Sequence, residues 1–184
     1  MLTKLTVPLL TALLLVLSAA AQQQPCGKTL SEAPAIHGLR LGMTFEEFYS
    51  ALGQDMKMKP PKTGEGSFFL DFNELPPPNN FKGVKAAYVR FFNNKVYQIE
   101  IFYDDKDQVT KLEDFTNRLS TDLNLSATAW KIKNAHAEID CGDFVLTADV
   151  VLNRHIELTD DAALTEFKKK KQQEKESRKK SRSR

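Results

Sequence analysis

VKAAYVRFFNNKVYQIEIFY, residues 84–103, decides the fold expected for this chain. Asn93 and Asn94 tolerate left-handed backbone dihedrals, so they predict a two-residue turn that joins two antiparallel strands and pairs Phe92 with Lys95. The face expected to lie on the core carries Val84, Ala86, Tyr88, Arg90, Tyr97, Ile99, Ile101 and Tyr103. The other face is half polar, and its apolar members form the expected partner-binding surface: Val89, Phe91, Val96 and Phe102.

A second hairpin is predicted around a turn at residues 142–143. In this register Cys141 lies opposite Phe144 on an apolar face, together with Ile139, Leu146, Ala137 and Ala148. The opposite face pairs His136 with Asp149. Alternation and apolar content predict two further strands, at residues 68–72 and 156–158.

Two amphipathic helices are also predicted, one before the strand at residues 68–72 and one between the two hairpins. Thr44 and Glu47 form a capping box in front of a helix over residues 45–52, which ends at Gly53. The second helix covers residues 109–123 and opens with Thr110 and Glu113 as a similar pair. We therefore expect one α+β domain over residues 22–167, with an antiparallel sheet of about five to seven strands and two helices packed on one face.

The order of the predicted elements leaves two interpretations open. Each helix is followed by about three strands, which fits two α-β-β-β halves that share one sheet. Two amphipathic helices that share a pattern by chance explain the order equally well.

The first 21 residues have the layout of a secretory signal peptide. Lys4 precedes an apolar run over residues 5–17, small residues follow at 18–21, and Gln22 begins a polar segment. The alternative is an uncleaved membrane anchor, although the run is short for a bilayer span of about 20 residues. We expect the chain to be exported, to the periplasm or beyond the cell.

Two cysteines, Cys26 and Cys141, occur in the whole sequence. In an oxidising compartment two thiols in a small domain usually pair, so the sequence predicts a disulfide between them. The alternative is two unrelated thiols.

The net charge changes sign after residue 167. Residues 22–167 contain 15 Lys and Arg against 22 Asp and Glu, a net charge of −7, whereas residues 168–184 contain 10 against 2, a net charge of +8. This basic tail is the second expected partner-binding segment, through Lys168, Lys169, Lys170, Lys171, Arg178, Lys179 and Lys180. Outside the cytoplasm the candidate partners are anionic lipid headgroups, lipopolysaccharide phosphates or acidic wall polymers; we expect no nucleic acid, and the tail allows peripheral membrane contact. The alternative is a disordered, solubilising tail or the fraying end of a last helix.

The segment Gly42-Met43-Thr44-x-x-Glu47-Phe48-x-x-x-Leu52-Gly53 resembles a signature of small exported bacterial domains, G-M-T-x-x-E-V-x-x-x-L-G. These are the SmpA/OmlA (BamE-like) outer-membrane assembly lipoproteins and the β-lactamase inhibitor proteins, in which the motif starts a helical segment that packs on a small antiparallel sheet. Phe48 replaces the usual valine, Asp55 stands where a proline often follows, and residues 23–25 form no lipobox before Cys26. The resemblance implies an exported α+β binding or scaffold domain rather than an enzyme or a lipid-anchored protein.

The sequence predicts no catalytic residue, no cofactor and no metal site. His37, His136 and His155 do not have the spacing of a metal-binding motif. We therefore expect a non-catalytic domain of the bacterial cell envelope that binds a protein or an anionic envelope component. The alternatives are a small extracytoplasmic hydrolase with a site not visible in the sequence, which a pocket gathering His136, Asp149 and a nucleophile would identify, and a membrane-surface protein that depends on its basic tail.

Overall fold

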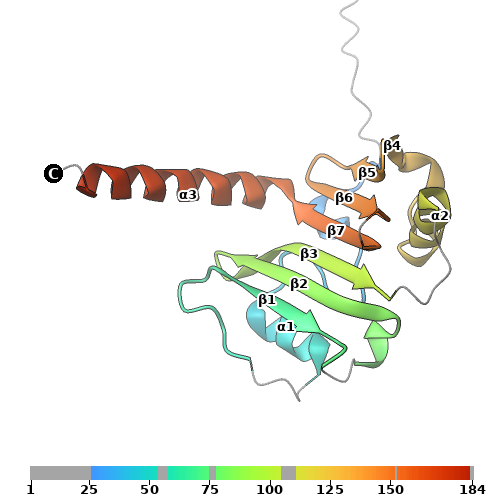
Figure 1. The fold of residues 1–184 in the computed structure, drawn as a ribbon, viewed down its shortest axis with the longest axis horizontal. Coiled ribbons are helices and arrows are strands. Elements are labelled where there is room, and N and C mark those ends of the chain that lie inside the picture. The colour runs from blue at the N-terminus through green and yellow to red at the C-terminus, as the bar shows by residue number, and fades with distance from the viewer. Residues whose placement is uncertain (1–25, 54–57, 75–77, 105–110, 152, 183–184) are drawn as a thin grey trace, which may run out of the picture.

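The structure is a computed structural model that describes residues 26–53, 58–74, 78–104, 111–151 and 153–182 (Figure 1). The predicted leader and the predicted helix cap at Thr110 lie outside these residues. The elements are α1 (Phe45–Leu52), β1 (Gly66–Asp71), β2 (Val84–Phe92), β3 (Lys95–Tyr103), α2 (Leu112–Asp122), β4 (Lys131–Lys133), β5 (His136–Asp140), β6 (Phe144–Asp149), β7 (His155–Asp160) and α3 (Asp161–Arg182). Short 3-10 turns lie at Leu30–Glu32, Asn79–Phe81 and Ala127–Ala129.

The seven strands of the described residues form one antiparallel sheet in the order β1-β2-β3-β7-β6-β5-β4. This confirms the expected α+β class and the antiparallel sheet. Three strands follow α1 and four follow α2, and the two groups meet where β3 pairs with β7.

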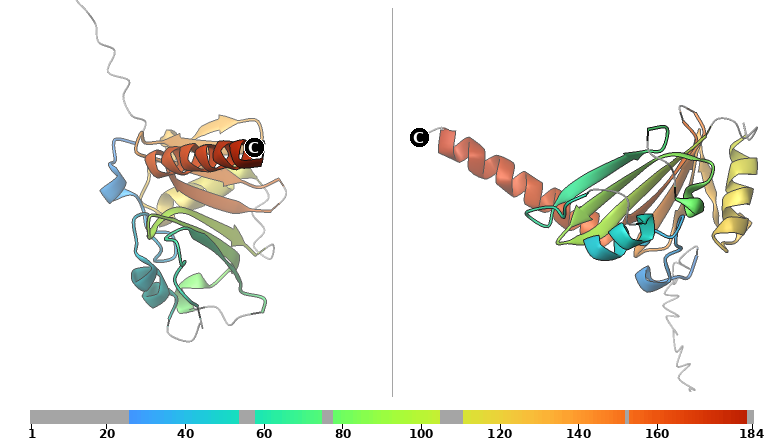
Figure 2. Two further views of the ribbon diagram at one scale, coloured as in Figure 1. Left: turned by 90° about the vertical axis from the view of Figure 1, so that its left-hand side faces the viewer. Right: turned by 90° about the horizontal axis from the view of Figure 1, so that it is seen from below.

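One row of apolar side chains crosses the sheet in register and forms the centre of the core. Its members are fully buried and come from five neighbouring strands: Val89, Ile99, Leu158, Leu146 and Ile139. The ring of Phe48 on α1 lies 5.6 Å from that of Phe68 and 5.4 Å from that of Phe91. Figure 2 shows α1 near the β1–β3 end and α2 near the other end, and both contribute to the same hydrophobic cluster.

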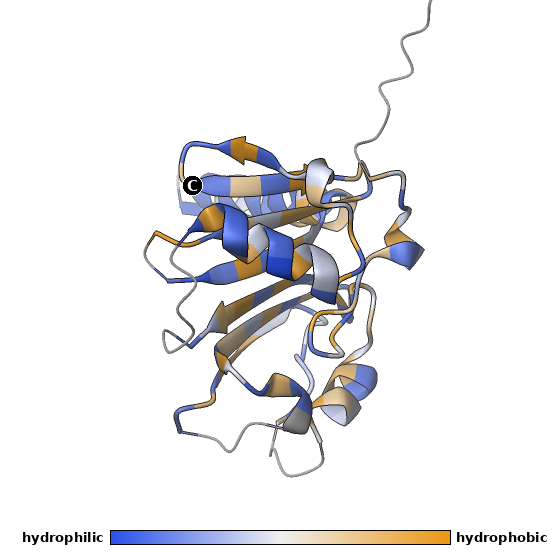
Figure 3. Ribbon diagram, turned by 90° about the vertical axis from the view of Figure 1, so that its right-hand side faces the viewer, coloured by the Kyte–Doolittle hydropathy of each residue, from blue (hydrophilic) through white to orange (hydrophobic). Residues whose placement is uncertain are grey.

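The predicted helix over residues 45–52 is confirmed, with both of its end signals. The Thr44 hydroxyl accepts the Glu47 N–H, and the Glu47 carboxylate accepts the Thr44 N–H at 2.8 Å. Gly53 ends the helix at φ +83°, a conformation that favours glycine. Hydrophilic and hydrophobic residues also alternate along α2 (Figure 3), whose buried side chains include Leu112, Phe115 and Leu119.

The expected assignment of faces in the β2–β3 hairpin is wrong. Phe92 pairs with Lys95 and Phe91 with Val96, as predicted, but Arg90 then pairs with Gln98, which makes Tyr97 the extra residue of a β-bulge. Because side chains alternate along a strand, this one-residue shift exchanges the two faces of β3 relative to β2.

The bulge removes most of the expected binding surface. Val89, Phe91 and Val96 are only 0%, 1% and 2% exposed, since they lie on the core face with Ile99 and Ile101. Phe102 lies on the opposite face of the sheet, which we call the open face, and is half-buried against His155 with ring centroids 5.4 Å apart. The open face also carries Tyr88, Arg90, Gln98, Glu100 and Glu157.

The second hairpin has the predicted register. Ala137 pairs with Ala148, Ile139 with Leu146 and His136 with Asp149. Cys141 lies on the buried face and forms the predicted disulfide with Cys26, with Cα atoms 5.2 Å apart. The Leu30 N–H donates to Asp143 Oδ2 at 3.1 Å, so the same turn holds the N-terminal segment at a second point.

The basic segment continues the last strand as a helix. The Asp160 carboxylate accepts the Ala163 N–H at 2.9 Å and starts α3, which runs without interruption to Arg182. None of the residues of α3 is fully buried. Figures 1 and 2 show the helix projecting beyond the sheet, so the structure places the tail in a defined direction.

Candidate functional site

The site begins where the first turns of α3 pack on the sheet. Phe167 places its ring 5.4 Å from that of Tyr97 and 5.7 Å from that of Phe92. Tyr97 and Phe92 are 3% and 4% exposed, although they lie outside the main core cluster. The bulge and the helix therefore form a small aromatic contact that fixes the direction in which α3 leaves the body.

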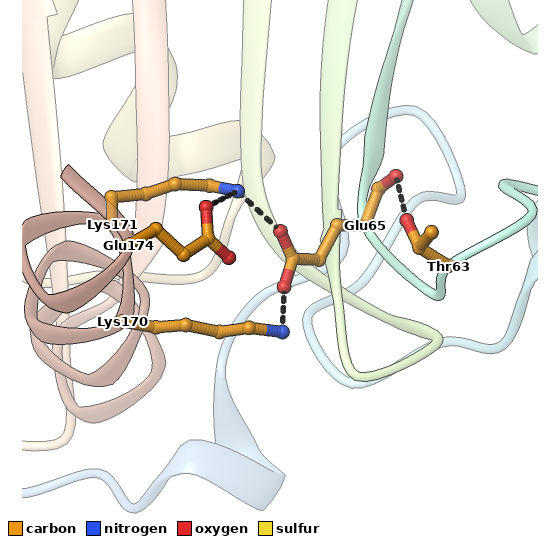
Figure 4. A network of polar contacts seen from close by, with 5 residues as sticks. All are labelled: Thr63, Glu65, Lys170, Lys171 and Glu174. Carbon is orange, nitrogen blue, oxygen red and sulfur yellow. Dashed lines mark hydrogen bonds and ion pairs between the residues drawn. The ribbon is translucent and has the colours of Figure 1, made fainter. Parts of the chain in front are cut away.

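A carboxylate on the loop before β1 holds the next turn of α3 (Figure 4). Glu65 accepts hydrogen bonds from Lys170 and from Lys171, the latter at 2.7 Å. Lys171 also contacts Glu174 at 3.3 Å. The two lysines lower the pKa of Glu65, and Glu65 in turn raises the pKa of Lys171, because each charge favours the other.

Six cationic side chains follow one side of α3, from the turn that contacts Glu65 to the end of the helix, and we call them the cationic stripe. At 3.6 residues per turn they fall within a sector of about 100° and extend over about 21 Å. They are Lys168, Lys171, Lys175, Arg178, Lys179 and Arg182, all exposed. The other cations of the helix, Lys169, Lys170 and Lys180, fall outside this sector.

A groove of about 420 Å³ lies between the stripe and the open face of β1 and β2. Its lining includes Ser67, Tyr88, Arg90, Phe167 and Lys171. The Arg90 guanidinium lies 4.7 Å from the centre of the Tyr88 ring and donates a hydrogen bond to Gln98. A hydrogen bond with Ser67 lowers the pKa of Tyr88, and Arg90 lowers it to a lesser extent. Lys171 belongs to both features, so the groove and the stripe are continuous.

The seven predicted tail residues thus divide into two sets. Lys168, Lys171, Arg178 and Lys179 belong to the stripe, whereas Lys169, Lys170 and Lys180 do not. Sequence reasoning missed Lys175 and the residues of the body that complete the site. The helical spacing of residues 171, 175 and 178 was a signal for Lys175, but nothing local connects Glu65 or Arg90 to the tail.

The residues of the alternative hydrolase site also lie on the open face. His136 and Asp149 are cross-strand neighbours, and Asp149 also pairs with His155 on β7. His155 Nε2 lies 3.9 Å from the Glu100 carboxylate. Within the described ranges, no group of three or more His, Cys, Asp or Glu side chains is arranged to hold a metal ion.

No protein-family model matches the sequence, and no curated protein or solved structure matches it either. The resemblance to the SmpA/OmlA and β-lactamase inhibitor signature therefore stays a prediction from the motif at residues 42–53. Among the helices of the described residues, none is both long and apolar enough to cross a bilayer.

Proposed function

We propose that this chain is an exported, non-catalytic binding domain that recognises an anionic component of the bacterial cell envelope through α3. The cationic stripe is the observation that carries the proposal. It places six cationic side chains on one side of a projecting helix, of which Lys171 is paired with the carboxylates of Glu65 and Glu174, while the body to which the helix is attached has a net negative charge.

Attachment of the helix to the body supports a binding role. Phe167 and Glu65 fix the base of α3, so the stripe is presented in one orientation rather than on a free tail. A preorganised charge array loses less conformational entropy on binding than a flexible one. The segment from 168 to 182 contains no apolar residue, so we expect its interactions to be electrostatic and sensitive to salt.

The disulfide supports the extracytoplasmic part of the proposal. A bond between Cys26 and Cys141 is compatible with an oxidising compartment, where such bonds persist.

The proposal is tested by binding of the full chain to two anionic probes, inorganic polyphosphate and phosphatidylglycerol vesicles, at salt concentrations from 25 to 300 mM. Binding of at least one probe at low salt, with affinity falling as salt rises, is the expected result. The variant Lys175→Gln/Arg178→Gln should weaken binding about tenfold, because it removes two stripe charges. The matched control Lys169→Gln/Lys180→Gln removes the same charge outside the stripe and should change affinity less than twofold.

Failure of both probes to bind at 25 mM salt would overturn the proposal. Equal losses in the two double variants would also contradict it, since binding would then depend on total charge rather than on the stripe. Circular dichroism and the melting temperature of each variant show that the helix and the body remain folded.

A further inference from the structure

We infer that the anionic component is a linear, phosphate-bearing polymer without bases, which lies along the cationic stripe and continues into the groove beside Arg90. This inference rests on the proposed function and specifies its ligand class.

The position of the stripe favours a polymer over a membrane surface. Lys171 lies in the groove against β1 and β2, next to Tyr88 and Arg90. A flat bilayer that reached Lys171 would also meet the body, whose net charge of −7 over residues 22–167 opposes an anionic plane. A single polymer chain needs only a narrow track and can follow it past the body.

The spacing of the stripe suits a chain of closely spaced charges. Lys171, Lys175, Arg178 and Arg182 follow one another along the helix axis at rises of about 6, 4.5 and 6 Å. Lys175 with Lys179, and Arg178 with Arg182, are like-charge pairs four residues apart, an arrangement that destabilises an isolated helix. A polyanion that neutralises successive cations relieves this repulsion and releases its own counterions.

The groove adds a site suited to a phosphate group. An arginine guanidinium is a planar fork that matches phosphate oxygens, and the contact with Tyr88 and the hydrogen bond to Gln98 hold that of Arg90 in place. Ser67 places a hydroxyl group in the same groove. Glu65 also lines the groove, but Lys170 and Lys171 already neutralise its carboxylate.

The aromatic rings of the groove argue against single-stranded nucleic acid. Proteins bind its bases by stacking them on free aromatic faces. Phe167 is stacked on Tyr97 and has Lys171 5.3 Å from its centre, while Arg90 covers Tyr88. The rings are thus engaged within the protein.

The experiment compares three probes on the full chain at 100 mM salt: polyphosphate of about 20 units, oligodeoxythymidylate of 20 nucleotides, and phosphatidylglycerol vesicles. Polyphosphate is expected to bind tightest. Arg90→Gln, which keeps a polar side chain beside Gln98, should weaken polyphosphate binding at least threefold and leave vesicle binding unchanged. The matched control Arg40→Gln removes the same charge from an exposed position of the body outside the groove and should change polyphosphate affinity less than twofold. Melting temperatures exclude unfolding as the cause.

Each other outcome has a distinct meaning. Vesicle binding that equals or exceeds polyphosphate binding, or an Arg90→Gln variant with unchanged affinity, overturns the polymer inference but leaves the proposed function standing. Tighter binding of the oligonucleotide overturns the assignment to a polymer without bases. Loss of binding to every probe at low salt overturns the proposed function itself.

Discussion

Glu100 and Glu157 lie directly opposite each other on β3 and β7, in the middle of the open face. Cross-strand carboxylates repel each other, and burial further disfavours the ionised form of Glu100. Both effects raise the pKa of Glu100, and burial contributes more than the charge of Glu157. The nearby His155 partly opposes this increase in the pKa. The folded chain therefore holds one carboxylate in an unfavourable position at neutral pH.

This position predicts that Glu100→Gln stabilises the protein at pH 7, by about 0.2–1 kcal/mol. A carboxyl whose pKa is raised in the folded state lowers stability above that pKa, and the penalty is lost as pH falls towards the unfolded value of about 4.3. The gain from the neutral glutamine should therefore shrink between pH 7 and pH 4 in thermal melts.

The matched control for this prediction is Glu138→Gln. Glu138 lies on the same face, but it pairs with Lys133 at 3.0 Å, so its replacement should leave stability unchanged or slightly reduced at pH 7. A gain for Glu100→Gln that persists at pH 4 would contradict the electrostatic explanation.

At the scale of elements, the bulge at Tyr97 decides which side of the β2–β3 hairpin is buried. It brings the apolar residues of both strands to one face of the sheet, whereas a hairpin without the bulge would divide them between the two faces. It also directs Tyr97 to the aromatic contact with Phe167 at the base of α3. One extra residue in one strand thus determines both the core face and the anchoring of the projecting helix.

Two alanine substitutions on neighbouring strands test these faces. Phe91→Ala should lower the free energy of unfolding by about 3–5 kcal/mol, because the ring is buried against Phe48 and Phe68. Phe69 on β1 is 61% exposed, and Phe69→Ala should change stability by no more than about 0.5 kcal/mol. Chemical denaturation measures both, and equal effects would contradict this assignment of the buried and open faces.

At the scale of the whole molecule, the disulfide ties the beginning of the described chain to the β5–β6 turn across a sequence separation of 115 residues. A loop of that length loses much of its conformational freedom in the unfolded state when its ends are joined. The bond therefore contributes to the stability of the whole fold rather than to one element.

Removal of this bond by Cys26→Ala/Cys141→Ala should lower the free energy of unfolding by about 2–5 kcal/mol. Cys26→Ala alone should account for most of the loss, since Cys26 is only partly buried and the bridge is its main contribution. Calorimetry of the oxidised protein and both variants checks this. An unchanged melting temperature in Cys26→Ala would show that the bond does not stabilise the fold.

Local signals sufficed for several elements of the fold. Thr44 and Gly53 mark the two ends of α1. Asn93 and Asn94 make the turn between β2 and β3 at positive φ. The strict alternation of apolar and polar residues indicated the pairing of β5 with β6. Each of these features depends on residues close together in the chain, so the amino-acid sequence by itself determined them. The disulfide followed from the presence of only two cysteines in a chain expected to be exported.

Tertiary structure alone decided the faces of the hairpin and the composition of the candidate site. Val89, Phe91 and Val96 became core residues because the bulge allows both strands to bury their apolar side chains together. Lys170 meets Glu65 across 105 residues, and Arg90 meets the stripe only because β7 directs α3 past β2. Such contacts depend on how whole elements pack, and the free energy of that packing has no signature in any short stretch of sequence.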